Sequence, residues 1–327
     1  MCYKPGPIES NPLTLEEVER PSLSSMELLV QVQTCGVCHT DLHVVEGDLP
    51  LTRFPIIPGH EVVGNVVEIG SRVRKFKIGD RVGIFWLHSA EGACFFCQQG
   101  LENLCDNATF TGYTTNGGYA QFITVGENFA LHLPEEYSDV EVAPLLCAGI
   151  VGYRALRLAD VQLGERIGLY GYGASGHLII QVARYWGCEV YVFTRSPAHQ
   201  QLAKEDGAVW VGRPFDQPPV KLDKSILFAP AGAIVPYALA NLRKGGTLCI
   251  NAIRMTDFPA MPYSLFWEER IIRTVANANR DDADDFLRLA PQIPVKVRPQ
   301  VFSLEQANLA LNLLKRGEIQ GAAVLKL

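Results

Sequence analysis

The sequence lacks both a long hydrophobic run and an excess of positive charge. Its longest apolar stretch covers residues 142–153 and includes Pro144, so it is too short to cross a bilayer. The formal net charge of −6 at pH 7 gives no electrostatic footprint for binding DNA or RNA. The first residues, MCYKPGPIES, lack the basic-then-apolar order of a signal peptide. We therefore expect a cytoplasmic protein that binds neither a membrane nor a nucleic acid.

A disulfide framework is not expected either, although the chain has nine cysteines. Such frameworks are typical of short secreted chains, whereas most of these cysteines stand in clusters within a long chain. Metal ligation explains such clusters better in a reducing compartment. Cys2, Cys188 and Cys249 lie outside any cluster, and we expect them to take no part in the chemistry.

With 327 residues the chain exceeds the usual size of a single core, so we expect two domains. Between about residues 20 and 147, short β-prone runs alternate with Gly, Pro and Asp, which predicts a barrel-like all-β unit; the runs are 28–34, 62–70, 80–85 and 119–125. After about residue 150 strands and helices alternate, which predicts βαβ units and a parallel sheet; the strands are 166–173, 188–195, 225–232, 247–253 and 271–277, and the helices 174–187, 197–208 and 233–246.

The last part of the chain, with a helix at 303–318 and a strand at 322–327, is expected to return to the first domain. The predicted fold is therefore an α/β two-domain fold. A Rossmann-type, doubly wound domain at 150–277 is inserted between the two parts, 1–149 and 278–327, of a β-barrel domain.

A glycine-rich turn marks the start of the second domain. Its residues fit G-x-G-x-x-G between a predicted strand and a predicted helix, where the backbone and the helix N-terminus can bind a dinucleotide pyrophosphate. The alternative is a purely structural turn. The predicted cofactor-binding residues are Gly171, Gly173, Ala174, Ser175 and Gly176.

The end of the second strand in this domain carries no acid. NAD-binding folds usually have Asp or Glu there, which accepts a hydrogen bond from the ribose 2′-hydroxyl. Here the chain reads Thr194-Arg195-Ser196, and an arginine can pair with a 2′-phosphate. These residues predict a preference for NADP(H), with NAD(H) possible; in the alternative, Arg195 is only a solvated loop residue.

Two cysteines and a histidine stand in three distinctive runs. Cys38 lies in CGVCHTDLH (35–43), His60 in PGHEVVGNVVEIG (58–70), and Cys147 in APLLCAGIVGYRAL (143–156). Zinc prefers four-coordinate N/S surroundings, and three protein ligands leave the fourth position open for water or substrate. The triad therefore predicts a catalytic zinc site.

With these motifs the chain resembles the zinc-dependent medium-chain alcohol dehydrogenases, from about residue 5 to the end. The run from Gly59-His60-Glu61 to Gly70 and Val73 matches the family's signature segment, and the loops around Cys38 and Cys147 match its other two ligand loops. The Cys₂His ligand set is itself characteristic of this family, so it is recognised as much as derived. The resemblance implies a GroES-like barrel as the catalytic domain and a homodimer or homotetramer.

The resemblance also implies an activity, a reversible hydride transfer between a primary alcohol, or its aldehyde, and NADP(H). Zinc would lower the pKa of the alcohol or polarise the carbonyl. Asp41 is the expected acceptor for the His60 ring, and Thr40 and His43 the expected proton relay. Glu61 matches an acidic neighbour of the zinc, with a purely structural carboxylate as the alternative.

Three further residues are implied around the substrate and the cofactor. Trp86 is expected to form a wall of the substrate pocket, and the smaller Leu49 stands where some ethanol-specific relatives have a large aromatic. Trp86 favours primary alcohols over bulky ketones; in the alternative it is a core aromatic. His39 stands where relatives often have a basic residue near the pyrophosphate.

A second cysteine cluster has the spacing of the family's structural zinc lobe. Cys94, Cys97 and Cys105 match it, but Glu91 stands where a fourth cysteine is usual. Because a carboxylate is an acceptable zinc ligand, we expect a closed, non-catalytic site and two zinc ions per chain. The alternative is an empty site.

Other functions stay open at this point. An NAD-dependent alcohol dehydrogenase, or a zinc dehydrogenase for polyols or glutathione adducts, would carry the same motifs. A non-catalytic dinucleotide-binding protein is less compatible, because the ligands and the relay residues are all present. Metal-free quinone reductases share the architecture but lack the ligand set.

Overall fold

The computed structural model describes residues 1, 4–50 and 53–327, so the interpretation of Cys2 lies outside the described residues. Within those residues the chain divides into two compact units. The first unit contains Met1–Ala148, Ala278–Pro291 and Val297–Leu327, and the second contains Gly149–Asn277 and Gln292–Lys296. The predicted ranges did not include 292–296 in the second unit. This segment belongs there because Lys296 exchanges backbone hydrogen bonds with the Gln181 side chain, at 2.8 and 3.0 Å.

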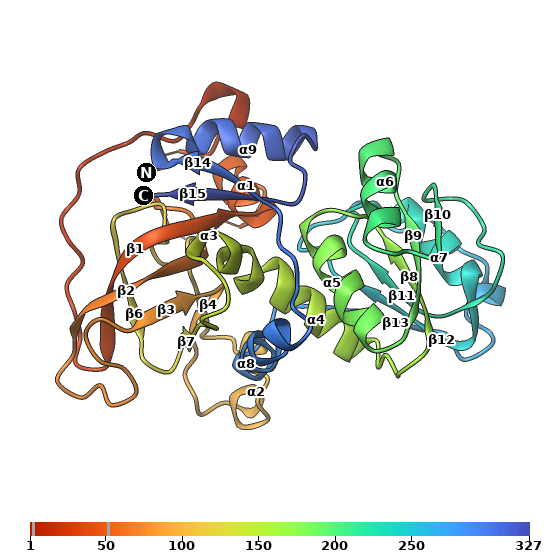
Figure 1. Cartoon of the computed structure of the whole chain (residues 1–327), viewed down its shortest axis with the longest axis horizontal. Coiled ribbons are helices and arrows are strands. Elements are labelled where there is room, and N and C mark those ends of the chain that lie inside the picture. The colour runs from red at the N-terminus through yellow and green to blue at the C-terminus, as the bar shows by residue number, and fades with distance from the viewer. Residues whose placement is uncertain (2–3, 51–52) are drawn as a thin grey trace. The chain divides into compact units, whose positions relative to one another are not determined.

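The first unit is built around a mostly antiparallel sheet with the strand order β14-β15-β1-β2-β3-β7, in which β6 also pairs with β1 (Figure 1). Its last strand, β15, pairs with the end of β1 from Thr34↔Lys326 to Val37↔Ala323, so the C-terminal segment does return to this unit. The strands are β1 Glu27–Val37, β2 Glu61–Ile69, β3 Arg81–Ile84, β4 Leu87–Ser89, β5 Thr109–Phe110, β6 Phe122–Gly126, β7 Ala130–His132, β14 Pro299–Ser303 and β15 Ala322–Lys326.

Within the described residues, three short helices begin directly after a cysteine: α1 after Cys38, α2 after Cys94 and α4 after Cys147. Helix α1 ends at Glu46 and is capped by Gly47, whose φ of 78° suits a glycine. A 3₁₀ turn, Ala143–Leu146, leads to Cys147, and α4 begins at the next residue. The helices are α1 His39–Glu46, α2 Phe95–Gln98, α3 Asp139–Val142, α4 Ala148–Leu158 (which continues into the second unit), α8 Arg280–Leu289 and α9 Ala307–Arg316.

The second unit is a parallel sheet with the order β10-β9-β8-β11-β12-β13. This is the strand order of doubly wound dinucleotide-binding folds, in which the ligand binds where the order reverses, here between β8 and β11. The predicted fold class is confirmed. The elements are β8 Arg166–Tyr170, α5 Ala174–Tyr185, β9 Glu189–Phe193, α6 Pro197–Glu205, β10 Trp210–Gly212, β11 Leu222–Leu227, α7 Val235–Asn241, β12 Leu242–Ile250 and β13 Ile271–Thr274.

One predicted strand begins later than expected. The run 119–125 was predicted as a strand, but β6 begins at Phe122. The backbone N–H groups just before it are used elsewhere, because those of Gly117, Gly118 and Tyr119 donate to the carbonyls of residues 57–59 at 2.7–3.0 Å. This segment therefore packs on the loop before His60 instead of extending the sheet.

Each unit has its own apolar core. The core of the first unit gathers residues of β1, β2, β3 and α9, such as Val30, Val62, Ile84 and Leu311. That of the second gathers β9, β11, α7 and β12, and includes Phe193 stacked on Tyr170 at 4.0 Å between ring centroids. In the described part of the chain, no helix is both long and apolar enough to span a membrane.

Candidate functional site

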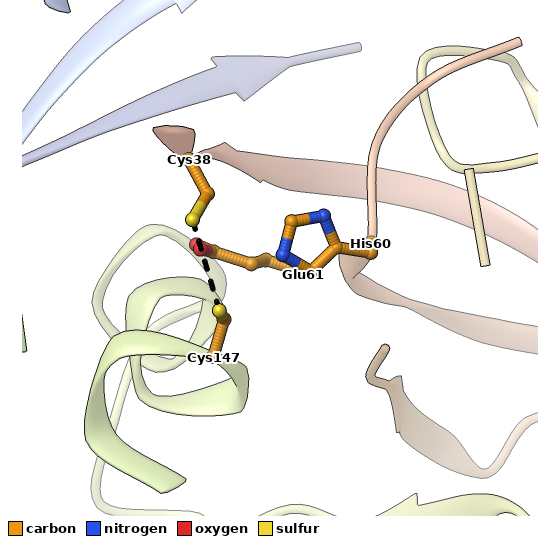
Figure 2. Close-up of side chains that lie close together, drawn as sticks. All are labelled: Cys38, His60, Glu61 and Cys147. Atoms are coloured by element: carbon orange, nitrogen blue, oxygen red, sulfur yellow. Dashed lines mark hydrogen bonds between the residues drawn. The ribbon is translucent and has the colours of Figure 1, made fainter. Parts of the chain in front are cut away.

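Cys38, His60, Glu61 and Cys147 come together within the first unit. Their potential ligand atoms all lie within 4.8 Å of one another, and the two sulfurs are 3.8 Å apart. Figure 2 shows the side chains of Cys38, His60 and Cys147 converging from three separate segments. His60, Glu61 and Cys147 are buried, and Cys38 is half-buried. The three predicted ligands and Glu61 thus form one cluster.

The Asp41 carboxylate joins two of these segments. Its Oδ2 accepts a hydrogen bond from the backbone N–H of Cys38 at 2.9 Å, and its Oδ1 accepts one from that of Gly59 at 3.1 Å. Oδ1 also accepts a bond from His60 Nδ1 at 2.8 Å. A proton on Nδ1 leaves Nε2 as the free lone pair, which fixes the tautomer and the orientation of the ring.

His60 Nε2 has the properties expected of a metal ligand. It is buried and has no hydrogen-bond partner among the described residues, although an unpaired buried polar atom costs about 1–3 kcal/mol. The adjacent sulfurs share a proton in a hydrogen bond of 3.8 Å in which either atom can be the donor, and this contact holds the pKa of Cys38 well below its usual value. The same contact raises the pKa of Cys147. A divalent ion would replace that proton and satisfy Nε2, so the residues present fit zinc.

Glu61 lies beside the sulfurs in a tightly fitted position. Burial raises the pKa of its carboxyl group well above the usual value. Its Oε2 occupies the space where a Cβ on Gly36 would stand, at 1.7 Å, so only glycine fits at position 36. Position 36 on β1 is therefore dictated by the carboxylate of the neighbouring strand β2.

Thr40 and His43 lie on α1, one turn apart. Thr40 is buried, and its Oγ1 is 3.8 Å from Cys38 Sγ. His43 is half-buried and donates from Nδ1 to Asp48 Oδ2 at 2.9 Å. No direct hydrogen bond links the two side chains in the described structure. His39, at the start of the same helix, is exposed.

Trp86 packs against the cluster as part of an aromatic group. Its ring meets His60 edge-on at a centroid distance of 5.2 Å, and stacks on Phe110 at 5.2 Å and on Tyr113 at 5.7 Å. Leu49 lies in the neighbouring apolar cluster with Tyr113. The sequence did not single out Phe110 and Tyr113, because loop aromatics give no periodic signal and only the fold stacks them on Trp86.

The second cysteine group also forms, with the sulfurs of Cys94, Cys97 and Cys105 within 4.8 Å of one another. Glu91 interacts with Cys94 but is not part of that set of mutually close ligand atoms. Its Oε2 accepts a hydrogen bond from the Asn107 side chain. The structure thus gathers the three thiols and leaves the Glu91 carboxylate directed to Asn107.

The glycine-rich turn lies at the carboxyl end of β8, in the second unit. Gly171 has a φ of 98°, and a Cβ there would be 2.9 Å from the backbone N of Ala229. A Cβ on Gly176 would be 3.0 Å from the carbonyl of Gly171, whereas nothing lies within 4 Å of one on Gly173. The first and last glycines therefore allow close packing, and Gly173 leaves open space at the N-terminus of α5, where Ala174 and Ser175 begin the helix.

The residues after β9 lie beside the end of β10. Thr194 donates from its backbone N–H to the carbonyl of Gly212 at 2.9 Å, so Arg213 follows directly beside Thr194 and Arg195. Both arginines are exposed, and within the described residues neither side chain forms an ion pair. Ser196 caps α6 by accepting from the backbone N–H of His199 at 3.4 Å. The sequence alone did not identify Arg213 as a candidate residue, because only the pairing of β9 with β10 brings it beside Thr194 and Arg195.

A barrel-type unit with a Cys₂His cluster, joined to a parallel dinucleotide-binding sheet, defines a class of metal-dependent dehydrogenases. The sequence model of the alcohol dehydrogenase GroES-like domain matches residues 24–135. The chain is also 48% identical to the probable alcohol dehydrogenase AdhA of Mycobacterium tuberculosis, over 98% of this chain and 95% of that protein. It belongs to the zinc-dependent medium-chain alcohol dehydrogenase family and is an oxidoreductase with alcohol dehydrogenase activity.

Solved structures agree with the fold. A cinnamyl alcohol dehydrogenase of Sorghum bicolor, SbCAD4, aligns with a TM-score of 0.90 at 27% identity, over 98% of this chain and 96% of that chain. The protein CAD of Helicobacter pylori, complexed with NADP(H), aligns with a TM-score of 0.85 at 25% identity, over 93% of this chain and 91% of that chain. The family and the fold inferred from the sequence are confirmed.

Proposed function

We propose that this alcohol dehydrogenase is zinc-dependent and transfers hydride reversibly between a primary alcohol and its aldehyde, with NADP(H) as the preferred cofactor. The observation that carries the proposal is the convergence of two thiols and the unpartnered His60 Nε2 on one point. Cys38, Cys147 and His60 would hold the ion. Bound zinc supplies a Lewis acid that lowers the pKa of an alcohol next to it.

The surrounding residues then have defined roles. Asp41 orients His60 and the backbone of Cys38. Thr40 Oγ1, next to Cys38, accepts the hydroxyl proton of the alcohol and passes its own proton to the cofactor ribose and on to His43, which exchanges a proton with solvent. As hydride leaves the carbinol carbon for the nicotinamide, this proton leaves the oxygen, which balances the oxidation to aldehyde. Trp86 excludes water on one side and presents a flat apolar wall beside His60.

The second unit supplies the nucleotide contacts. The backbone of residues 171–176 and the start of α5 bind the pyrophosphate. Arg195, with Thr194 and Ser196, binds a 2′-phosphate, and the exposed Arg213 beside them adds a second positive charge. The NADP(H) complex of the Helicobacter relative is consistent with this preference.

The remaining attributes are part of the same proposal. We place His39 near the pyrophosphate and Leu49 in the substrate pocket. Cys94, Cys97 and Cys105 hold a second, structural zinc that Glu91 completes when its carboxylate turns from Asn107. The exposed Ile271 on the edge strand β13, and the exposed Trp267 in the turn before it, support a homodimer or homotetramer. The free cysteines favour a reducing, cytoplasmic location.

The test combines metal analysis with cofactor kinetics. We expect about two zinc ions per chain, and turnover of short aldehydes with NADPH that chelation abolishes and added zinc restores. Cys147→Ser should lose the catalytic ion but keep the second one. A wild-type enzyme that reduces aldehydes equally well without metal, or that prefers NADH, would contradict the zinc role or the cofactor preference, respectively.

A further inference from the structure

The loop before His60 forms backbone hydrogen bonds with a distant segment of the chain, Gly117-Gly118-Tyr119. Backbone N–H groups of this segment donate to the carbonyls of Ile57 at 2.7 Å, Gly59 at 2.9 Å and Pro58 at 3.0 Å. These are the residues immediately before the ligand His60. The position of His60 therefore depends on a segment about sixty residues further along the chain.

The contact is too close to admit side chains. A Cβ on Gly117 would lie 2.1 Å from the carbonyl oxygen of Gly59, and one on Gly112 would lie 2.7 Å from its backbone N. A Cβ on Gly118 would lie 2.3 Å from Val62 Cγ2. Because Gly117 and Gly112 face backbone atoms of Gly59, neither loop can shift without moving the other.

Tyr119 extends this contact to the Asp41 carboxylate. Its side chain is buried, with the ring covering Gly59, where a Cβ would lie 2.3 Å from Tyr119 Cδ1. Its hydroxyl donates to Asp41 Oδ2 at 3.4 Å. Oδ2 is also the oxygen that accepts the backbone N–H of Cys38, while Oδ1 accepts from Gly59 and His60. Tyr119 thus completes the donors around the carboxylate that links two ligand segments.

We propose that Tyr119 is a positioning residue of the metal centre, whose hydroxyl holds the Asp41 carboxylate in the plane that aims His60 Nε2 and the Cys38 thiolate at one ion. The inference rests on the proposed function of the cluster. Without the hydroxyl, Oδ2 keeps only the Cys38 N–H, so the plane of the carboxylate is fixed less tightly, and with it the direction of the imidazole bonded to Oδ1. A purely structural tyrosine would instead contribute packing and one hydrogen bond, with no effect specific to the metal.

The experiment compares Tyr119→Phe with a matched control, Tyr137→Phe. Tyr137 is a buried tyrosine of the same unit, and its hydroxyl donates to the carbonyl of Ala290 at 2.9 Å. Zinc release to a chromophoric chelator is followed in the holoenzyme, and the phase missing in Cys147→Ser is assigned to the cluster. Mutation of a residue that bonds a metal ligand typically changes metal affinity about 10- to 100-fold. Because Tyr119 acts only through Asp41, we expect a smaller effect: zinc release roughly three- to tenfold faster in Tyr119→Phe and unchanged in Tyr137→Phe.

A spectroscopic measurement separates positioning from general loosening. With Co²⁺ in place of zinc, the d–d and sulfur-to-metal bands report the geometry of the ligands, and they should shift in Tyr119→Phe but not in the control. Equal release rates and identical spectra in all three proteins would overturn the positioning role while leaving the proposed function intact. If the wild type shows no metal that depends on Cys147, the proposed function fails, and the inference with it.

Discussion

Replacing Asp41 should separate its two roles, as a partner of backbone groups and as a partner of His60. In Asp41→Asn the amide oxygen can replace Oδ1 and keep the bonds from Gly59 and His60. The amide NH₂ then replaces Oδ2 and faces the N–H of Cys38, which loses its acceptor. One buried donor left unsatisfied costs about 1–3 kcal/mol, so we expect this loss in the free energy of unfolding of the metal-free protein.

Asp41→Ala leaves four donors without an acceptor: Cys38 N–H, Gly59 N–H, His60 Nδ1 and the Tyr119 hydroxyl. The corresponding sum is about 4–12 kcal/mol, an upper limit because neighbouring terms do not add. Zinc affinity should fall about 10- to 100-fold in Asp41→Ala, since the imidazole loses its partner and its orientation. The fall should be smaller in Asp41→Asn, where the amide oxygen keeps the bond from His60.

The assay has two parts, urea unfolding with chelator present and competition for zinc without it. Asp282→Asn is the control, because Asp282 is a buried carboxylate that caps α8 and accepts the backbone N–H of Asn279. It should lower stability but not zinc affinity. Unchanged zinc affinity in both Asp41 variants, or an equal loss in the control, would refute the assigned role.

Other predictions concern single contacts. Arg213→Ala should lower kcat/KM for NADPH about tenfold relative to that for NADH. An equal effect on both cofactors would refute a contact between Arg213 and the 2′-phosphate. Gly36→Ala should destabilise the protein by about 1–3 kcal/mol. Glu61→Ala should restore part of that stability in the double variant, as urea unfolding would show, because it removes the carboxylate but keeps the Cβ of residue 61, 2.8 Å from the new Cβ. Backbone N–H groups of residues 74–75 lower the pKa of Glu127. Their stabilisation is therefore present above the usual Glu pKa of about 4.3 and is lost as the pH falls through the lower folded value. Glu127→Gln should cost more stability at neutral pH than in acid; a pH-independent loss would contradict this.

The sequence was informative where function depends on local runs. The local runs around Cys38, Asp41 and His60 already predict the metal ligands, the carboxylate that bonds one of them, and a strand next to each run. The role of the glycines in residues 171–176 could also be predicted, because few sequences form so tight a turn between a strand and a helix.

Features that depend on distant pairing could not be read in the same way. Arg213 joins Arg195 only through the register of β9 and β10, and periodicity does not specify which strands are neighbours. Tyr119 appeared to begin a strand because it precedes an alternating apolar run. Its backbone instead binds the loop before His60, and no local pattern distinguishes a β-prone residue in a strand from one that binds another loop.

The pairing of β1 with β15 has a consequence for how the protein is made. Residues 34–37, which lead into Cys38, acquire their neighbour on one edge only when residues 323–326 leave the ribosome. By then most of the second unit, residues 149–277, has already been synthesised as a continuous segment that can fold by itself. During translation, one edge of the strand that precedes Cys38, the first proposed metal ligand, therefore stays unpaired until then. We expect zinc loading at Cys38 to be a late event, after β15 has paired with β1.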